Sequence, residues 1–280
     1  MTATERTLLA GCGDLGLRVA ERLLAHGEAV WALRRHPLRQ AAHGLHWIQA
    51  DLTDAASLAQ LPKGITRLVY LPAPDGRDKA SYRALYLDGL QHVLAALDRR
   101  ALKRVLLVSS SAVYGEHDGD WVDEATPLRP LGFNGAVLRE AEDWLAAQDL
   151  PAVVLRLAGL YGPGRLQLAE RLRAGQVKVP REVPHWANRI HVDDAAAAIV
   201  HLLAVARPEA VYIGSDDTPL PLDELYDFVA DLVDAAPPAE GAAPPGVGSK
   251  RLSNGRLKRS GWKPAWPDAR AGYAALLDDD

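Results

Sequence analysis

Three glycines near the start of the chain have the spacing of a phosphate-binding turn. Gly11, Gly13 and Gly16 form a G-x-G-x-x-G pattern between an apolar, strand-like run and a stretch of helical spacing. Gly11 would allow a tight turn, Gly13 would leave room for a pyrophosphate, and Gly16 would let the helix pack closely on the strand. The N–H groups at the start of that helix would attract the phosphates. Residues 1–35 are therefore predicted to form half of a dinucleotide site, with an ordinary glycine-rich turn as the alternative.

Two arginines stand where a site for NAD would carry an acidic residue. The predicted second strand, residues 30–33, ends in Arg34 and Arg35, about 20 positions beyond the glycines. A guanidinium at this point can bind the 2′-phosphate of NADP through paired, charge-assisted hydrogen bonds. We therefore predict NADP as the cofactor and keep NAD as the alternative. Both arginines could also be solvated residues of a loop, as surface arginines usually are.

Hydroxyl groups follow the predicted fifth strand, residues 105–108. Ser109, Ser110 and Ser111 come directly after it. The carboxyl end of a buried parallel strand is where α/β sheets place their ligands. Serine is also common in loops, so the position alone leaves a ligand site and an ordinary loop equally open.

The elements that must position these residues alternate along the chain as strand and helix. Strands are predicted at 7–10, 30–33, 45–50, 65–71, 105–108, 152–157 and 211–214, and helices at 79–99, 166–173 and 221–233. This order predicts an α/β fold with a doubly wound parallel sheet, the Rossmann fold, and a smaller C-terminal substrate lobe. We assign 1–164 mainly to the dinucleotide-binding domain and 165–280 mainly to the substrate lobe, with 189–215 returning to the first.

Other candidate cofactor contacts come from the ends of these strands. Asp51 could accept a hydrogen bond from the adenine amino group, although it could instead cap a helix, for which Asp54 is the better candidate. Residues 71–74 offer small apolar groups beside a cofactor, or merely a stiff turn. From the chain up to this point, the predicted cofactor-binding residues are Gly11, Gly13, Asp14, Leu15, Gly16, Arg34, Arg35, Asp51, Leu52, Leu71, Pro72 and Ala73.

Composition excludes several classes of protein. The net charge is −4 and no basic run alternates with aromatic residues, so nucleic acid is not an expected partner. No long uncharged apolar stretch and no signal-peptide pattern is found, so we expect a cytoplasmic protein that does not contact a membrane. The single cysteine, Cys12, cannot form an internal disulfide. The expected partner is a small-molecule substrate, and the protein is expected to be a monomer or homodimer.

Several motifs then occur in a fixed order along the chain. They are the glycine turn, Asp51, S-S-S-A-V-Y-G at 109–115, Arg156 followed by Y-G-P-G at 161–164, R-I-H-V-D-D-A at 189–195, K-R-L-S-N at 250–254 and G-W-K-P at 261–264. Together they resemble the extended short-chain dehydrogenase/reductases, the nucleotide-sugar epimerase and dehydratase group. The resemblance spans nearly the whole chain. It implies that Leu157 and Ala158 border the nicotinamide.

The resemblance also points to what is missing from the site. In that family a Ser or Thr four residues before the Tyr of V-Y-G binds the reacting oxygen, and Ser110 stands there. The family's acid/base is a Tyr with a Lys four residues later. Asn134 takes the place of that Tyr and Leu138 that of the Lys. Asn cannot ionise and Leu cannot hold a ribose, so the chain most resembles the atypical branch that keeps the fold and the Ser.

Other residues could replace the lost pair. Tyr161 and Tyr114 lie in loops that border the site in relatives, His117 and His191 could titrate near neutral pH, and Arg139 follows the lost Lys position. Each also has a structural or solvent-exposed alternative. The candidate catalytic residues are Ser110, Asn134 and Tyr161.

Two functions are consistent with this pattern. The first is an NAD(P)-dependent oxidoreductase, or an epimerase or dehydratase, of atypical chemistry acting on a small hydroxylated or sugar-like substrate. The second is a non-catalytic NADP-binding sensor or regulatory protein, because the glycine turn reports binding and not turnover. Retention of Ser110 favours the enzyme.

Overall fold

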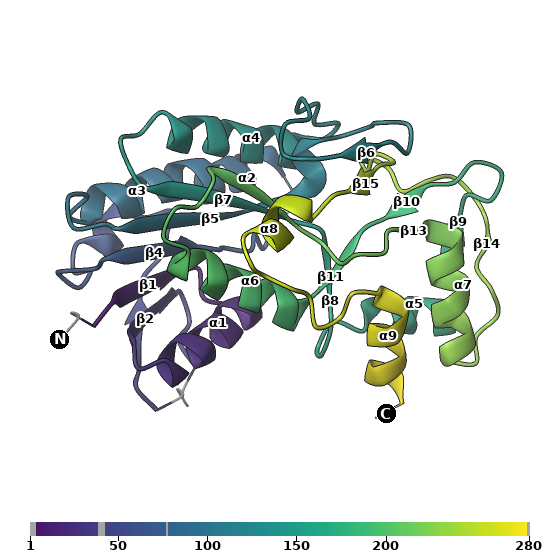
Figure 1. Ribbon diagram of the computed structural model, residues 1–280, viewed down its shortest axis with the longest axis horizontal. Helices are drawn as coiled ribbons and strands as arrows, with labels where there is room; N and C mark the ends of the chain where they lie inside the picture. Colours follow the sequence, from purple (N-terminus) through teal and green to yellow (C-terminus); the bar gives the residue numbers. More distant parts are fainter. Residues whose placement is uncertain (1–3, 39–42, 77, 279–280) are drawn as a thin grey trace. The chain divides into compact units, whose positions relative to one another are not determined.

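The computed structural model describes residues 4–38, 43–76 and 78–278, which form two compact units (Figure 1). The first unit comprises Met1–Ser109, Ala136–Leu155 and Ala196–Val211. The second unit comprises Ser110–Gly135, Arg156–Ala195 and Tyr212–Asp280. Each unit is therefore assembled from three separate stretches of the chain.

Seven strands of the described chain form one sheet in the order β12-β7-β5-β4-β1-β2-β3. Their bounds are β1 Arg6–Ala10, β2 Ala29–Arg34, β3 Leu45–Gln49, β4 Arg67–Tyr70, β5 Arg104–Ser110, β7 Ala152–Leu157 and β12 Val211–Gly214. β1 pairs in parallel with β2 on one side and with β4 on the other. The strand order reverses between β1 and β4, at the kind of switch point where open α/β sheets bind ligands. The predicted α/β fold with a doubly wound sheet is confirmed.

Helices cover both faces of this sheet because its strands are apolar on both sides. Figure 1 shows α2, α3 and α4 on one face and α1 and α6 on the other. Side chains from β1, β4 and β5, among them Leu8, Leu68 and Leu107, are fully buried in a cluster that α3 and α4 complete. The bounds are α1 Asp14–Ala25, α2 Lys79–Arg83, α3 Gly89–Ala96, α4 Phe133–Ala146 and α6 Val192–Ala204.

The helix predicted over 79–99 contains a turn that the sequence pattern did not show. Between α2 and α3 lies a π-helical turn, Ala84–Asp88. Tyr70, fully buried at the end of β4, donates its hydroxyl to the carbonyl oxygen of Leu85 at 2.5 Å. A Cβ at Gly89 would lie 2.5 Å from the same hydroxyl. The tyrosine therefore draws one carbonyl to itself, which accounts for the wider turn.

The second unit is built from short strand pairs and a helical cluster. β8 (Gly159–Tyr161) pairs in parallel with β11 (Arg189–His191), and β10 (Trp186–Ala187) pairs antiparallel to β13 (Leu220–Pro221). Further strands are β6 Trp121–Val122, β9 Lys178–Val179, β14 Ala239–Glu240 and β15 Arg251–Leu252, and the helices are α5 Gln167–Arg173, α7 Leu222–Leu232, α8 Gly255–Arg259 and α9 Ala269–Leu277. Apolar side chains of α5, α7 and α9 form its core.

A buried carboxylate fastens the segment before α9 within the second unit. Asp194, which is 3% exposed, accepts hydrogen bonds from the backbone N–H groups of Ala265 and Trp266 at 2.8 and 2.9 Å. These bonds join the R-I-H-V-D-D motif to residues 71 and 72 positions further along the chain. The second aspartate of that motif therefore has a structural partner of its own.

Replacing this carboxylate should destabilise the protein. Asp194→Ala would leave two backbone donors without their acceptor and should cost about 3 kcal/mol in free energy of unfolding. Asp194→Asn keeps one acceptor oxygen and should cost less. Urea unfolding followed by circular dichroism measures both, and an alanine variant as stable as wild type would contradict this role.

Candidate functional site

The glycine turn between β1 and α1 is held by close backbone contacts. Gly11 has φ +89°, a left-handed conformation that favours glycine, and a Cβ there would lie 2.5 Å from the Cα of Pro72. The N–H groups of Gly11 and Cys12 both donate to the carbonyl of Leu33, at 3.1 and 2.9 Å. A Cβ at Gly16 would lie 2.9 Å from the Cys12 sulfur. The turn thus packs tightly against the ends of β2 and β4.

Gly13 differs from its two neighbours in the motif. Apart from its chain neighbours, no atom lies within 4 Å of the position that its Cβ would occupy. Its backbone is extended, with φ −94°, so the turn itself does not require glycine there. The free space is what a pyrophosphate would need beside the start of α1, whose first N–H groups lack intrahelical partners.

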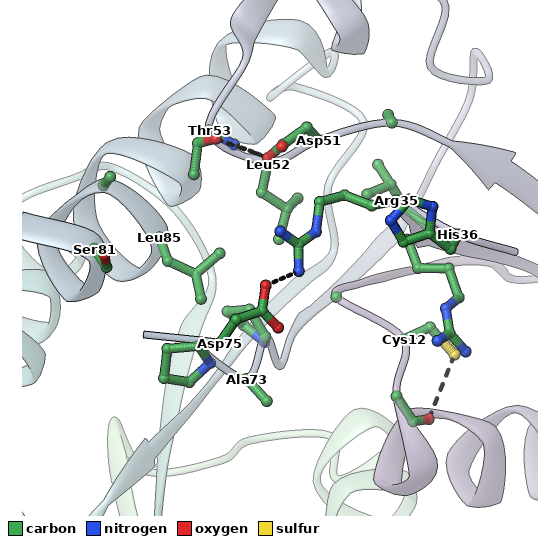
Figure 2. Close-up of a pocket in the computed structure, with 18 of the residues that line it drawn as sticks. Cys12, Arg35, His36, Asp51, Leu52, Thr53, Ala73, Asp75, Ser81 and Leu85 are labelled. Atoms are coloured by element: carbon green, nitrogen blue, oxygen red, sulfur yellow. Dashed lines mark hydrogen bonds and ion pairs between the residues drawn. The ribbon is translucent and has the colours of Figure 1, made fainter. Parts of the chain in front are cut away.

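The turn opens on a cavity of about 510 Å³ that lies within the first unit. Its wall is formed by the glycine turn, the ends of β2 and β3, the loop after β4 and the helical segment that follows (Figure 2). The structure brings together eight of the residues predicted from sequence to bind a cofactor: Gly11, Gly13, Arg34, Arg35, Asp51, Leu52, Pro72 and Ala73. The volume of the cavity and the free space beside Gly13 fit the adenosine and phosphate part of a dinucleotide.

The remaining predicted cofactor residues lie outside the lining of this cavity. Asp14 is exposed at the start of α1 and pairs with Arg18 at 3.2 Å. Leu15, Gly16 and Leu71 are buried behind the turn. Leu157 and Ala158 are buried in the second unit, where Ala158 donates its N–H to the carbonyl of Gly214 at 2.8 Å.

The two arginines of the cavity have different surroundings. Arg35 points toward Asp75 and forms an ion pair with it (Figure 2). The hydrogen bond to Asp75 holds the pKa of the Arg35 guanidinium above its ordinary value. Arg34 lies over the ring of Trp47, 6.0 Å from the centroid, and has no carboxylate partner among the residues described.

The pKa values of Asp51 and Cys12, which both line the cavity, are shifted in opposite directions. Burial opposes ionisation of Asp51, but hydrogen bonds from Thr53, at 2.8 and 2.9 Å, and the charge of Arg35 outweigh it and lower its pKa. Burial raises the pKa of the Cys12 thiol to about 12, against the opposing charge of Arg34. Cys12 is therefore protonated at neutral pH and is unsuited to nucleophilic or redox chemistry.

Ser110 lies in the second unit, at the end of β5. It caps a short 3₁₀ turn, Ser111–Val113, by accepting the N–H of Ala112 at 3.2 Å, and it is half-buried. A Cβ at Gly135 would lie 2.4 Å from the carbonyl oxygen of Ala112, so the first turn of α4 packs directly on this segment. That contact brings the backbone beside Asn134 close to the turn that Ser110 begins. Leu138 is buried in the first unit.

The tyrosines of the second unit are packed as structural residues. The Tyr114 hydroxyl is fully buried and accepts a hydrogen bond from Arg156 at 2.8 Å. Tyr161 is 1% exposed and stacks on Tyr273 with ring centroids 4.7 Å apart. Its hydroxyl has no hydrogen-bond partner in the described chain, and burial raises its pKa well above the ordinary value. A tyrosine in this environment is a poor base at neutral pH.

The other residues considered as substitutes for the acid/base pair also have contacts within the protein. His117 contacts the carbonyl of Tyr114 at 3.0 Å, and His191 packs edge-on against Tyr161 with its Nδ1 accepting the N–H of Asp193 at 3.2 Å. Arg139 is exposed on α4 and pairs with Asp143 at 3.6 Å. In the part of the chain that the structure describes, no group of His, Cys, Asp or Glu is arranged to hold a metal ion.

Two charged residues were not identified as site residues from sequence. Asp75 lies one residue beyond the predicted apolar loop, and its partner Arg35 is 40 positions away. Lys250 belongs to the quoted K-R-L-S-N motif, but its burial was not evident. Its ammonium group donates to the carbonyls of Gly115 and Gly248, both at 3.1 Å, and burial lowers its pKa to about 8. It thereby fastens the turn that follows Tyr114.

Known proteins share this architecture and part of its sequence. A solved structure from Methylobacillus flagellatus, assigned to the NAD-dependent epimerases/dehydratases, is 40% identical with a TM-score of 0.82, over 99% of both chains. UDP-glucose 4-epimerase of Thermus thermophilus, solved in complex with NAD, is 25% identical with a TM-score of 0.80, over 98% of both chains. Protein YeeZ of Escherichia coli (strain K12) is 31% identical over 219 residues, which cover 74% of this chain and 76% of YeeZ.

The family model of the NAD dependent epimerase/dehydratase family matches residues 8–214. This match includes the glycine turn, the cavity and the serine segment, and it confirms the relationship predicted from the motifs. Among the described residues, no helix is long and apolar enough to span a membrane. The chain belongs to the NAD-dependent epimerase/dehydratase family.

Proposed function

We propose that this protein binds NADP in the cavity of the first unit and acts as an oxidoreductase, or as an epimerase or dehydratase, on a small hydroxylated or sugar-like substrate. The observation that carries the proposal is the pair Arg34 and Arg35 in the cavity wall at the end of β2. A carboxylate there would bind the ribose hydroxyls of NAD, whereas guanidinium groups suit the 2′-phosphate of NADP. The cofactor would supply hydride transfer to or from the substrate carbon.

Ser110 and Asn134 are the polar groups that we propose for the substrate. Ser110 carries a hydroxyl that can donate to or accept from a substrate oxygen, and Asn134 carries an amide that can do both. Neither ionises near neutral pH, so these two side chains orient a substrate without acting as its base. We assign Tyr161 a packing role, because its hydroxyl is buried and its pKa is raised. An unassigned residue or a water molecule would then accept the hydroxyl proton when hydride leaves the substrate carbon, and return it in the reverse direction.

A non-catalytic NADP sensor is the second candidate. It is favoured by Asn134 and Leu138 at the positions of the family's tyrosine and lysine. The two candidates share the cavity and differ only in turnover. Calorimetric titration of the protein with NADP⁺, NADPH, NAD⁺ and NADH tests what they share, and a screen of hydroxylated and sugar-like compounds for hydride transfer separates them. Binding of none of the four dinucleotides would reject both.

Substitutions of Gly13 and Gly11 should affect dinucleotide affinity and protein stability differently. Gly13→Val places a side chain in open space, so it should cost no more than about 1 kcal/mol of stability, as a poorer N-cap does. It should weaken dinucleotide binding at least tenfold, or about 1.4 kcal/mol, by filling the pyrophosphate position. Gly11→Ala, with its left-handed backbone and its contact with Pro72, should instead destabilise the fold by at least about 2 kcal/mol. Unfolding curves and calorimetry distinguish the two, and unimpaired binding by Gly13→Val would contradict the placement of the phosphates.

The arginines should discriminate between the two cofactors. Replacing Arg34 and Arg35 together by alanine removes charge-assisted hydrogen bonds to the 2′-phosphate, each contributing about 1.5–3 kcal/mol. Affinity for NADP⁺ should therefore fall at least about tenfold while affinity for NAD⁺ changes little. Equal losses for both cofactors, measured by calorimetry, would show that the arginines do not bind the 2′-phosphate.

Ser110→Ala should lower turnover without affecting cofactor binding. Loss of one hydrogen bond to a reacting oxygen typically reduces kcat about 100-fold. Ser111→Ala removes the neighbouring hydroxyl and serves as the matched control. Both variants are to be assayed on a compound that the wild-type protein turns over. Unchanged kcat in Ser110→Ala would remove this serine from the mechanism.

A further inference from the structure

Arg35 pairs with one carboxylate in the cavity of the first unit and lies within the electrostatic influence of a second. It forms its ion pair with Asp75 from the loop after β4, and it also experiences the charge of Asp51 after β3. Figure 2 shows the Arg35 and Asp75 side chains directed toward one another. Both carboxylates belong to residues that line the cavity. A ligand that binds this guanidinium must therefore compete with the carboxylate of Asp75.

The ion pair has unequal consequences for the two dinucleotides. A 2′-phosphate would bind the N–H donors of the guanidinium, and Asp75 already accepts a hydrogen bond from Nη2 of Arg35. The negative charge of the phosphate is also repelled by the same carboxylate. The ribose of NAD carries a neutral hydroxyl at that position and experiences neither effect. A carboxylate here thus opposes NADP more strongly than NAD.

Arg34 is not subject to this competition. It rests over Trp47 on the side of the cavity near Cys12, and among the described residues no carboxylate pairs with it. A phosphate can therefore approach Arg34 without displacing a partner. The two arginines should contribute differently, with Arg34 as the available cation and Arg35 as the one whose availability Asp75 sets.

We propose that Asp75 is a specificity-determining residue, which limits the preference of this protein for NADP over NAD by competing with the 2′-phosphate for Arg35. The proposal rests on the dinucleotide site argued above and deepens it. The side chains of Arg35 and Asp75 are 49% and 71% exposed, and ion pairs this exposed are weak and readily exchanged. Phosphate can therefore displace Asp75, at a cost in affinity.

The test is Asp75→Asn in the full chain, with binding of NADP⁺ and NAD⁺ measured by calorimetry at low salt. The asparagine amide has nearly the same shape as the aspartate carboxylate but has no negative charge. Affinity for NADP⁺ should rise about two- to fivefold, the range expected for an exposed charge pair, while affinity for NAD⁺ stays unchanged. The gain should shrink as salt is added, because exposed charges are screened.

Two further variants make the result specific. Asp143→Asn removes the same charge from an equally exposed, arginine-paired carboxylate, 70% exposed, that does not line the cavity, and it should change neither affinity. In an Arg35→Ala background, Asp75→Asn should give a smaller gain for NADP⁺ than in the wild type, because the competition for the guanidinium is gone.

The remaining outcomes overturn the proposal. Unchanged NADP⁺ affinity, or a loss of it, would show that Asp75 does not compete with the phosphate. A selective loss of NAD⁺ affinity would make Asp75 a ribose-binding carboxylate instead. These results leave the cavity as a dinucleotide site, whereas a wild-type protein that binds neither cofactor would refute that assignment and this proposal together.

Discussion

The contact between Gly11 and Pro72 is the constraint on which the cavity depends. It brings the turn after β1 against the loop after β4, at the point where the strand order of the sheet reverses. Any side chain at position 11 would separate these two segments. Because they touch, the glycine turn, the arginines after β2 and the carboxylate of Asp75 line one cavity. The positions of the charged groups that line the cavity therefore depend on a backbone contact that contains no charge.

The serine segment of the second unit is supported by residues from distant parts of the chain. Three separate contacts stabilise the segment around Ser110. Gly135 allows α4 to pack on it, Arg156 holds Tyr114, and Lys250 holds the turn at Gly115. The position of the serine segment is thus determined by backbone packing and by two buried cations.

Sequence predicted the features that local chemistry determines, and it missed those that depend on distant partners. The glycine turn, the strands and the arginines after β2 follow from short stretches, and their placement could be predicted. The π-helical turn depends on Tyr70 reaching Leu85 from another element, which periodicity cannot reveal. The pairing of Asp75 with Arg35 and the burial of Lys250 likewise arise only when separated segments meet. The sequence motif likewise does not show that Tyr161 is buried and stacks on Tyr273, which lies 112 positions later in the chain.

The interleaving of the two units has a consequence for how the chain folds as it is synthesised. Lys250 reaches back to Gly115 across 135 positions, and Asp194 binds backbone donors that lie 71 and 72 positions later. The serine segment therefore cannot acquire its final support until Lys250 has left the ribosome. Contacts between residues so distant in sequence require a large loss of chain entropy when they form, and this loss slows folding. Ribosome-bound chains that end before residue 250 should thus hold an incomplete second unit, exposed to chaperones and proteases until Lys250 has emerged.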